Sequence, residues 1–70
     1  MPNTYTAVTQ QSGDWWIGWI EEIPGVNCQE RTRGELLESL REALGEIIEL
    51  NREDARSRAE PGFAEEPISA

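Results

Sequence analysis

One six-residue stretch limits what this chain can fold into: Trp15 to Ile20, written WWIGWI. Aromatic and β-branched residues pack well on a pleated surface, so this stretch predicts a strand. Side chains alternate between the two faces of a strand, and here both alternating sets are apolar. One amphipathic helix covers only one face of a small sheet. The simplest cover for the other face is a second copy of the chain.

Two further strands are predicted around this stretch. Tyr5 to Gln11 alternates in the manner of a strand, and Ser12-Gly13-Asp14 supplies a tight turn, so the first two strands form an antiparallel hairpin. Pro24-Gly25 makes the next reversal of the chain. Val26 to Arg31 is then a short third strand with a weaker pattern.

The helix that follows is the most regular element of the sequence. Thr32-Arg33-Gly34-Glu35 matches a capping box, in which Thr and Glu satisfy the free amides at a helix start. Beyond it, apolar residues recur every three or four positions and form one stripe. The stripe consists of Leu36, Leu37, Leu40, Ala43, Leu44, Ile47 and Ile48.

The sequence is less informative after Leu50. Residues 51–60 are polar and fit one or two solvated helical turns, and Pro61-Gly62 ends any helix there. Phe63 and Ile68 fit either a short fourth strand or a disordered tail. Pro67 lacks an amide donor and would confine such a strand to the sheet edge. We therefore divide the chain into a domain at residues 1–60 and an edge strand or tail at residues 61–70.

Together these elements predict an α+β fold: a small antiparallel sheet of three or four strands with one helix on one face, in the order β-β-β-α and with a fourth strand left open. Which sheet face meets the helix is not determined by the pattern. We assign Trp16 and Ile20 to the side that a second copy covers. The predicted core is Tyr5, Ala7, Trp15, Ile17, Trp19, Val26, Leu36, Leu37, Leu40, Leu44, Ile47 and Ile48.

Chain length and cysteine content also favour self-association. A 70-residue chain buries only about 60% of its unfolded surface and is marginal as a monomer. Disulfides or metals often compensate in such chains, but this one has a single cysteine, Cys28, and no histidine. We expect a homodimer or tetramer. The unpaired cysteine and the lack of a signal-like or membrane-spanning segment lead us to expect a cytoplasmic protein.

The charge of the chain restricts its partners. Fourteen acidic residues against six arginines give a net charge of −8. Nucleic acids and anionic membranes repel such a chain, so we expect neither as a direct partner. A basic protein is the partner that this charge attracts. The alternative is that the acidic residues only keep a small domain in solution.

Catalytic chemistry finds little support in the sequence. No histidine is present to act as a base, and Cys28 has no cationic neighbour in sequence to lower the pKa of its thiol. Glu21 and Glu22 are adjacent, so on a strand their side chains point to opposite faces. Single, scattered glycines do not form a phosphate-binding loop. We expect no enzyme activity and no cofactor or metal.

A row of glutamates follows the helix opposite the leucine stripe. It comprises Glu35, Glu38, Glu42, Glu46, Glu49 and Glu53. A solvated face is the ordinary explanation for such a row. The functional alternative is a docking surface for a basic protein, because complementary charge speeds association. We select Glu42, Glu46 and Glu49 as its candidate residues.

The order of these motifs resembles the HicB-like antitoxin family. The shared features are an aromatic second strand (Trp16–Trp19), a Pro-Gly turn (Glu22–Gly25) and a threonine-capped helix (Thr32–Glu35), and they extend over about Tyr5 to Asn51. The resemblance implies a truncated RNase H-like β-β-β-α-β arrangement without nuclease activity. It also implies binding and neutralisation of a small basic HicA-type toxin that cleaves mRNA. Oligomers are common in the family.

Two features depart from the family pattern. Many members continue into a DNA-binding segment, and no room for one is seen before Ala70, so we expect no autonomous DNA binding. Glu30 stands where the family often has glycine, two residues before the capping Thr32. The leading hypothesis is an antitoxin-like protein. The alternatives are a stand-alone oligomeric adaptor or ligand-binding module without a toxin and, third, a remnant enzyme that uses Glu21 or Glu22.

Overall fold

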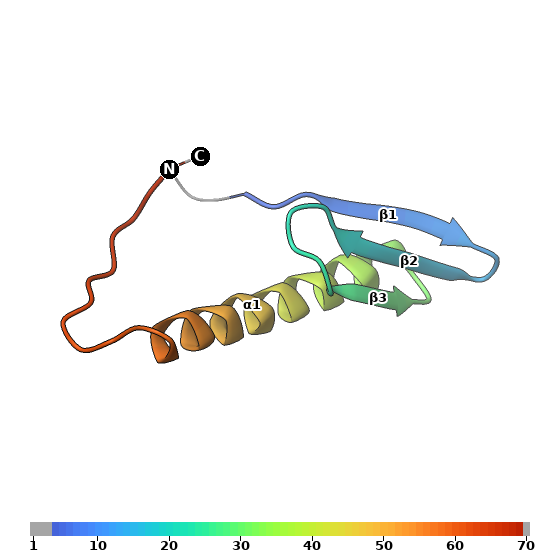
Figure 1. The fold of residues 1–70 in the computed structure, drawn as a ribbon. Helices are drawn as coiled ribbons and strands as arrows, with labels where there is room; N and C mark the ends of the chain where they lie inside the picture. The colour runs from blue at the N-terminus through green and yellow to red at the C-terminus, as the bar shows by residue number, and fades with distance from the viewer. Residues whose placement is uncertain (1–3, 70) are drawn as a thin grey trace.

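The computed structural model describes residues 4–69 and has the predicted α+β fold (Figure 1). Its elements are β1 (Ala7–Ser12), β2 (Trp15–Ile20), β3 (Asn27–Glu30) and α1 (Arg33–Ser57). The strands form an antiparallel sheet in the order β1-β2-β3, and α1 lies against one face of it. No fourth strand occurs within the described part of the chain, and residues 63–69 have no regular secondary structure.

The hairpin forms because the turn residues suit a two-residue loop. Ser12 pairs with Trp15, and Gly13 between them has a φ of 61°, a conformation that residues with a Cβ adopt at a cost. Gly25 has a φ of 92° in the reversal before β3, where the sequence places Pro24-Gly25. Both turns therefore lie where the sequence predicts them.

Helix α1 begins at the predicted cap. Thr32 has extended backbone angles, and its hydroxyl accepts a hydrogen bond from the Glu35 amide at 3.1 Å. The same hydroxyl donates to the Glu35 carboxylate at 2.9 Å, so the carboxylate bonds the threonine side chain rather than its backbone amide. A further contact joins the helix to β3, where Ser39 donates to the Glu30 carboxylate at 2.6 Å.

The helix packs on the face of β2 that carries Gly18. A Cβ built on Gly18 would lie 3.0 Å from Leu40 Cδ1 and 3.1 Å from Leu36 Cδ2. The missing side chain therefore lets α1 approach the centre of the sheet closely. This helix-covered face is called the inner face below, and the opposite face the outer face. Ile20, Val26, Leu36 and Leu40 form the buried core beneath the helix.

The assignment of Trp16 and Ile20 to an oligomer surface is therefore wrong. Ile20 is only 5% exposed and belongs to the core, and Trp16 packs against that core. The alternating set with Trp15 and Trp19 points away from the helix, where these two side chains are 36% and 37% exposed. The physical reason is the close approach of the helix at Gly18, which the set with Ile17 at its centre and a tryptophan on either side would prevent.

The rest of the predicted core is partly confirmed. Val26, Leu36 and Leu40 are buried as expected, whereas Ala7, Trp15 and Trp19 are exposed. The remaining predicted core residues are half-buried, namely Tyr5, Ile17, Leu37, Leu44, Ile47 and Ile48.

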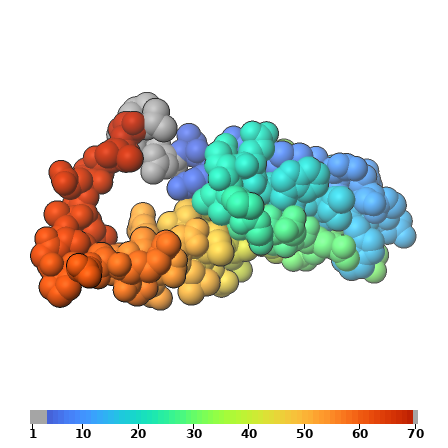
Figure 2. Space-filling model, viewed as in Figure 1, coloured from blue at the N-terminus to red at the C-terminus, as the bar shows by residue number. Residues whose placement is uncertain are grey.

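The molecule is elongated because α1 is longer than the sheet. The helix has 25 residues and extends about 37 Å, whereas a six-residue strand extends about 20 Å. The molecule measures 52 × 24 × 15 Å, and its radius of gyration of 15.2 Å exceeds the roughly 11 Å of a compact 70-residue domain. Figure 2 shows the second half of α1 and the tail beyond it standing clear of the sheet.

Candidate functional site

The glutamate row lies on the solvent side of α1, as the sequence predicts. A rotation of about 100° per residue places its six members within roughly 80° of one another, opposite the buried leucines. All six side chains are exposed, including Glu42, Glu46 and Glu49. The term acidic row below means these six residues: Glu35, Glu38, Glu42, Glu46, Glu49 and Glu53.

The members of the acidic row differ in how far their charge is compensated. Glu49 lies 3.9 Å from the Arg52 guanidinium and 3.7 Å from that of Arg56. Among residues 4–69, neither Glu42 nor Glu46 takes part in an ion pair. Exposed pairs at such distances contribute little to stability, but they do offset local charge. In the described part of the chain, Glu49 is thus the one member of the row whose charge is offset by ion pairs, and Glu42 and Glu46 lie in the middle of the row, where the charge is uncompensated.

The outer face of the sheet is a second exposed surface of a different character. The pairing register places three side chains from each of β1 and β2 on this face, together with two from β3. They are Val8, Gln10, Ser12, Trp15, Ile17, Trp19, Asn27 and Gln29. None of these side chains is charged. The outer face thus combines apolar groups with neutral amides and a hydroxyl.

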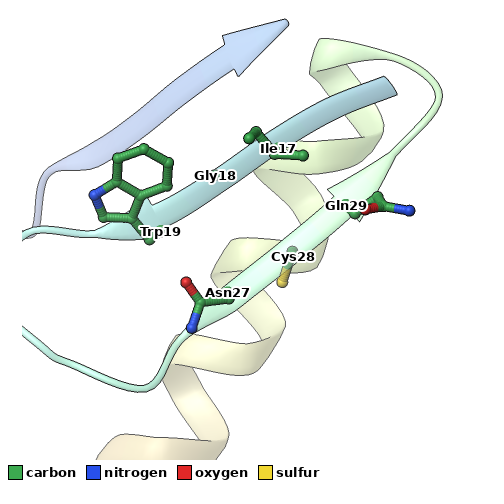
Figure 3. A pocket seen from close by; sticks show the side chains of 6 residues that line it. All are labelled: Ile17, Gly18, Trp19, Asn27, Cys28 and Gln29. Atoms are coloured by element: carbon green, nitrogen blue, oxygen red, sulfur yellow. The ribbon is translucent and has the colours of Figure 1, made fainter. Parts of the chain in front are cut away.

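Two local features shape the outer face. The Arg31 guanidinium carbon lies 4.1 Å from the centre of the Trp15 ring, a cation–π geometry that holds a positive charge at one end of β2. A hollow of about 440 Å³ lies between β2 and β3 (Figure 3). Its lining residues are Ile17, Gly18, Trp19, Asn27, Cys28 and Gln29.

A second hollow opens at the other edge of the sheet, between the start of β1 and the helix. Its volume is about 570 Å³, and among residues 4–69 Arg41 is the one charged residue that lines it. The apolar wall includes Tyr5, Leu37 and Leu44. These three predicted core residues remain half-buried because they border this hollow.

Cys28 has the properties of a structural thiol. It is half-buried against the core, and its pKa is raised, first by burial and second by the nearby Glu30 carboxylate. The thiol is therefore protonated at neutral pH, whereas a nucleophilic cysteine requires the thiolate. The position of Cys28 against the core is that of a small packing residue.

Glu21 and Glu22 hold the end of the hairpin. The Glu22 carboxylate accepts a hydrogen bond of 2.7 Å from the Thr6 amide, and this bond lowers the pKa of Glu22. The Glu21 amide donates to the Thr6 carbonyl at 2.9 Å, which continues the β1–β2 ladder by one step. Glu22 thus has a structural role at the position that the remnant-enzyme hypothesis would use.

Neither a metal-binding cluster nor a membrane-spanning helix is found in the described part of the chain. Within residues 4–69, no three histidine, cysteine or acidic side chains are grouped so that they would hold a metal ion. In the same range, no helix combines the length and apolar character needed to cross a bilayer.

Comparison of the chain with protein-family models, curated proteins and solved structures gave no match. The acidic row and the outer face are the two exposed surfaces considered for function. The sequence predicts the acidic row, but its pattern assigns Trp16 and Ile20 to the uncovered face, where the structure has Trp15 and Trp19. Gly18, in the middle of an otherwise bulky strand, is the sequence signal that would have corrected this assignment, because a glycine there marks close approach of another element.

Proposed function

We propose that this chain is a protein-binding module whose acidic row receives a small basic protein. The observation that carries the proposal is the uncompensated charge of Glu42 and Glu46 on an exposed helix side, in a chain with a net charge of −8. Complementary charge accelerates encounter with a basic partner and disfavours acidic ones. A rigid helix also holds the carboxylates in a fixed row, so the chain loses little conformational freedom on binding.

The resemblance to HicB-like antitoxins gives this partner a specific class. We propose a HicA-type toxin, a small basic ribonuclease that cleaves mRNA. A protein that binds RNA carries a basic surface, and an acidic helix side competes for that surface. Neutralisation then requires only that the bound chain blocks access of RNA to the toxin. No catalytic group of this chain is involved.

The alternative is a stand-alone oligomeric adaptor or ligand-binding module without a toxin. One observation favours it: the outer face presents exposed indoles and neutral amides, and none of the eight side chains that the strand pairing places there is acidic. The two proposals use different surfaces. Substitutions in the acidic row and on the outer face therefore separate them.

The test begins with capture of the tagged chain from its own cells and identification of the bound proteins by mass spectrometry. We expect a small basic ribonuclease, whose RNA cleavage is lost when the purified chain is added. Recovery of the chain alone, or cleavage that continues in the complex, would contradict the toxin proposal and favour the adaptor.

A charge-reversed variant then tests the surface itself. Glu42→Lys with Glu46→Lys is expected to weaken binding of the captured ribonuclease about 10-fold or more at low salt, because each reversal replaces attraction by repulsion. Added salt should reduce the difference, since exposed charges are screened. The matched control is Glu60→Lys with Glu66→Lys, which changes the net charge equally at exposed positions outside the row. Equal effects of both variants would remove the acidic row from the interface.

A further inference from the structure

Within residues 4–69, no element covers the outer face of the sheet. The core beneath the helix has four buried hydrophobic side chains in this range, which is few for a 70-residue domain. Trp15, Ile17 and Trp19 meanwhile lie in a row on the outer face, with more than a third of each indole-bearing side chain exposed. Burial of this row would remove apolar surface from water and stabilise the folded chain.

Charges of opposite sign lie at the two ends of this row of apolar side chains on β2. At the Trp15 end, the Arg31 guanidinium lies over the Trp15 ring. At the Trp19 end, Glu21 continues the alternation of β2 onto the outer face, and no cation lies among residues 20–30. The Arg31 guanidinium and the Glu21 carboxylate therefore lie at opposite ends of the row.

Such a row is complementary to itself when it is reversed. We propose that the outer face binds a second copy of this chain, with the two β2 strands antiparallel and related by a two-fold axis that passes between the two Ile17 side chains. In this arrangement Trp15 of each copy packs against Trp19 of the other. Arg31 of each copy then lies close to the partner's Glu21. A two-fold interface of this kind buries the same patch on both copies and closes on itself.

The geometry agrees with known sheet packing. Two sheets that pack face to face interleave their inward side chains at a spacing of about 10 Å, with strands within about 30° of one another. The hollow of about 440 Å³ beside Trp19 lies on the side of β2 that borders β3, where it can receive part of a partner side chain (Figure 3). The dimer thereby becomes a sandwich of two sheets with the helices outside.

Other occupants fit this surface less well. A basic partner finds no carboxylate among the eight outer-face residues, and nucleic acid is repelled by the net charge of −8. A second copy carries the same net charge, so it is repelled on most approaches. The outer face is where this repulsion is smallest and where the Arg31–Glu21 pairing turns it into attraction. This inference does not depend on the proposed toxin partner.

The size of the face sets the expected affinity. Three short strands cover about 20 Å by 10–15 Å, which places the interface at the low end of protein–protein contacts. We therefore expect a dissociation constant on the order of micromolar. Sedimentation of the purified full chain over a dilution series should show a change from dimer to monomer in this range.

Two sets of variants test the proposal. Trp15→Thr with Trp19→Thr should leave a folded monomer at every concentration, with helical circular dichroism retained. Leu50→Ser is the control, because Leu50 is 59% exposed on the part of α1 that extends beyond the sheet. This variant should dimerise as the parent chain does. A parent chain that stays monomeric up to millimolar concentration would overturn the proposal, as would an unchanged mass of the folded double variant.

Charge exchange gives a second test that does not alter the tryptophans. Arg31→Glu alone and Glu21→Arg alone should each weaken the dimer about 10-fold, because each places like charges together at two symmetry-related positions. The double variant Arg31→Glu with Glu21→Arg should recover most of the lost affinity. If the double variant is as weak as the single ones, the antiparallel arrangement is wrong.

Discussion

The two faces of β2 have nearly the same sequence and opposite environments. The inner face carries Trp16, Gly18 and Ile20, and the outer face carries Trp15, Ile17 and Trp19. The inner set is less bulky at two positions, with glycine rather than isoleucine at its centre and isoleucine rather than tryptophan at one end. The central glycine decides which face the helix covers, because a Cβ at Gly18 would lie 3.0 Å from Leu40 and 3.1 Å from Leu36. Overall apolar content does not distinguish the faces, whereas shape does.

Energetically the two faces also differ in what they contribute to one chain. The inner face belongs to a core that is complete within the monomer, with Ile20, Val26, Leu36 and Leu40 all buried. The outer face leaves its tryptophans partly in water, so its contribution to stability depends on what covers it. The following predictions test this division, in order of decreasing effect.

The largest contrast is expected between two isoleucines of the same strand. Ile20→Ala should lower the free energy of unfolding by about 2–5 kcal/mol, because it opens a cavity in the core. Ile17→Ala, on the half-buried outer face, should cost less than half as much in the isolated monomer. Urea denaturation at a concentration where the chain is monomeric measures both losses. Equal losses would mean that the faces are assigned wrongly.

Replacing glycine by alanine should change the stability of the fold in opposite directions in the sheet and in the helix. Gly18→Ala should destabilise the fold by about 1–3 kcal/mol, since its Cβ would meet Val8 O at 2.9 Å as well as the two leucines. Gly45→Ala should instead stabilise it by about 0.5–1 kcal/mol, because Gly45 lies within α1 and nothing is within 4 Å of an added Cβ. Thermal unfolding compares the two. Harmless substitution of Gly18 would contradict close packing at the inner face.

Loss of the helix cap should have a smaller effect. Thr32→Ala removes the hydrogen bond to the Glu35 amide and should cost about 1 kcal/mol. The cap fixes the start of α1 one turn before Leu36, so the variant should also loosen the first turn over the inner face. Amide exchange of Glu35 and Leu36, whose amides bond to Thr32, reports this opening. Thr32→Ser, which keeps the hydroxyl, should behave like the parent chain, and a loss of similar size there would point to the methyl group instead.

The smallest predicted effect depends on pH and lies at the end of the hairpin. The Thr6 amide holds the pKa of Glu22 below its usual value of 4.5. A carboxyl whose pKa is lower in the folded state stabilises the fold above the unfolded pKa, and this contribution is lost as the pH falls through the folded pKa. The parent chain should therefore lose slightly more stability than Glu22→Gln between neutral pH and the acid range. The measurement is the urea midpoint of both chains as a function of pH. If the two curves are parallel, the Thr6–Glu22 bond makes no pH-dependent contribution to stability.

Much of the fold could be predicted from local patterns. The bounds of β2, the Gly13 turn, the Thr32 cap and the leucine stripe follow from alternation, turn chemistry and capping, all of which act over a few residues. The exposure of the acidic row follows from the same helical period. Its binding role stays a prediction, because no pattern within one chain specifies a partner.

Local patterns could not predict which face of β2 meets the helix, nor the contacts across the sheet. The alternation predicts Trp15 and Trp19 as core and Trp16 as part of the oligomer side, but close packing of a helix depends on where bulk is missing, here at Gly18. The Arg31–Trp15 contact and the Glu30–Ser39 hydrogen bond join residues through the pairing of β2 with β3 and the placement of α1. Those contacts require the tertiary arrangement.

In this account, α1 covers the inner face within one chain, and a second copy of the chain covers the outer face. Nuclear magnetic resonance of the three tryptophan indole N–H groups tests it most directly, with a soluble paramagnetic agent added over a dilution series. We predict that Trp15 and Trp19 become protected as the concentration rises, while Trp16 is unaffected by concentration. A concentration-dependent change at Trp16, or none at Trp15 and Trp19, would contradict the account.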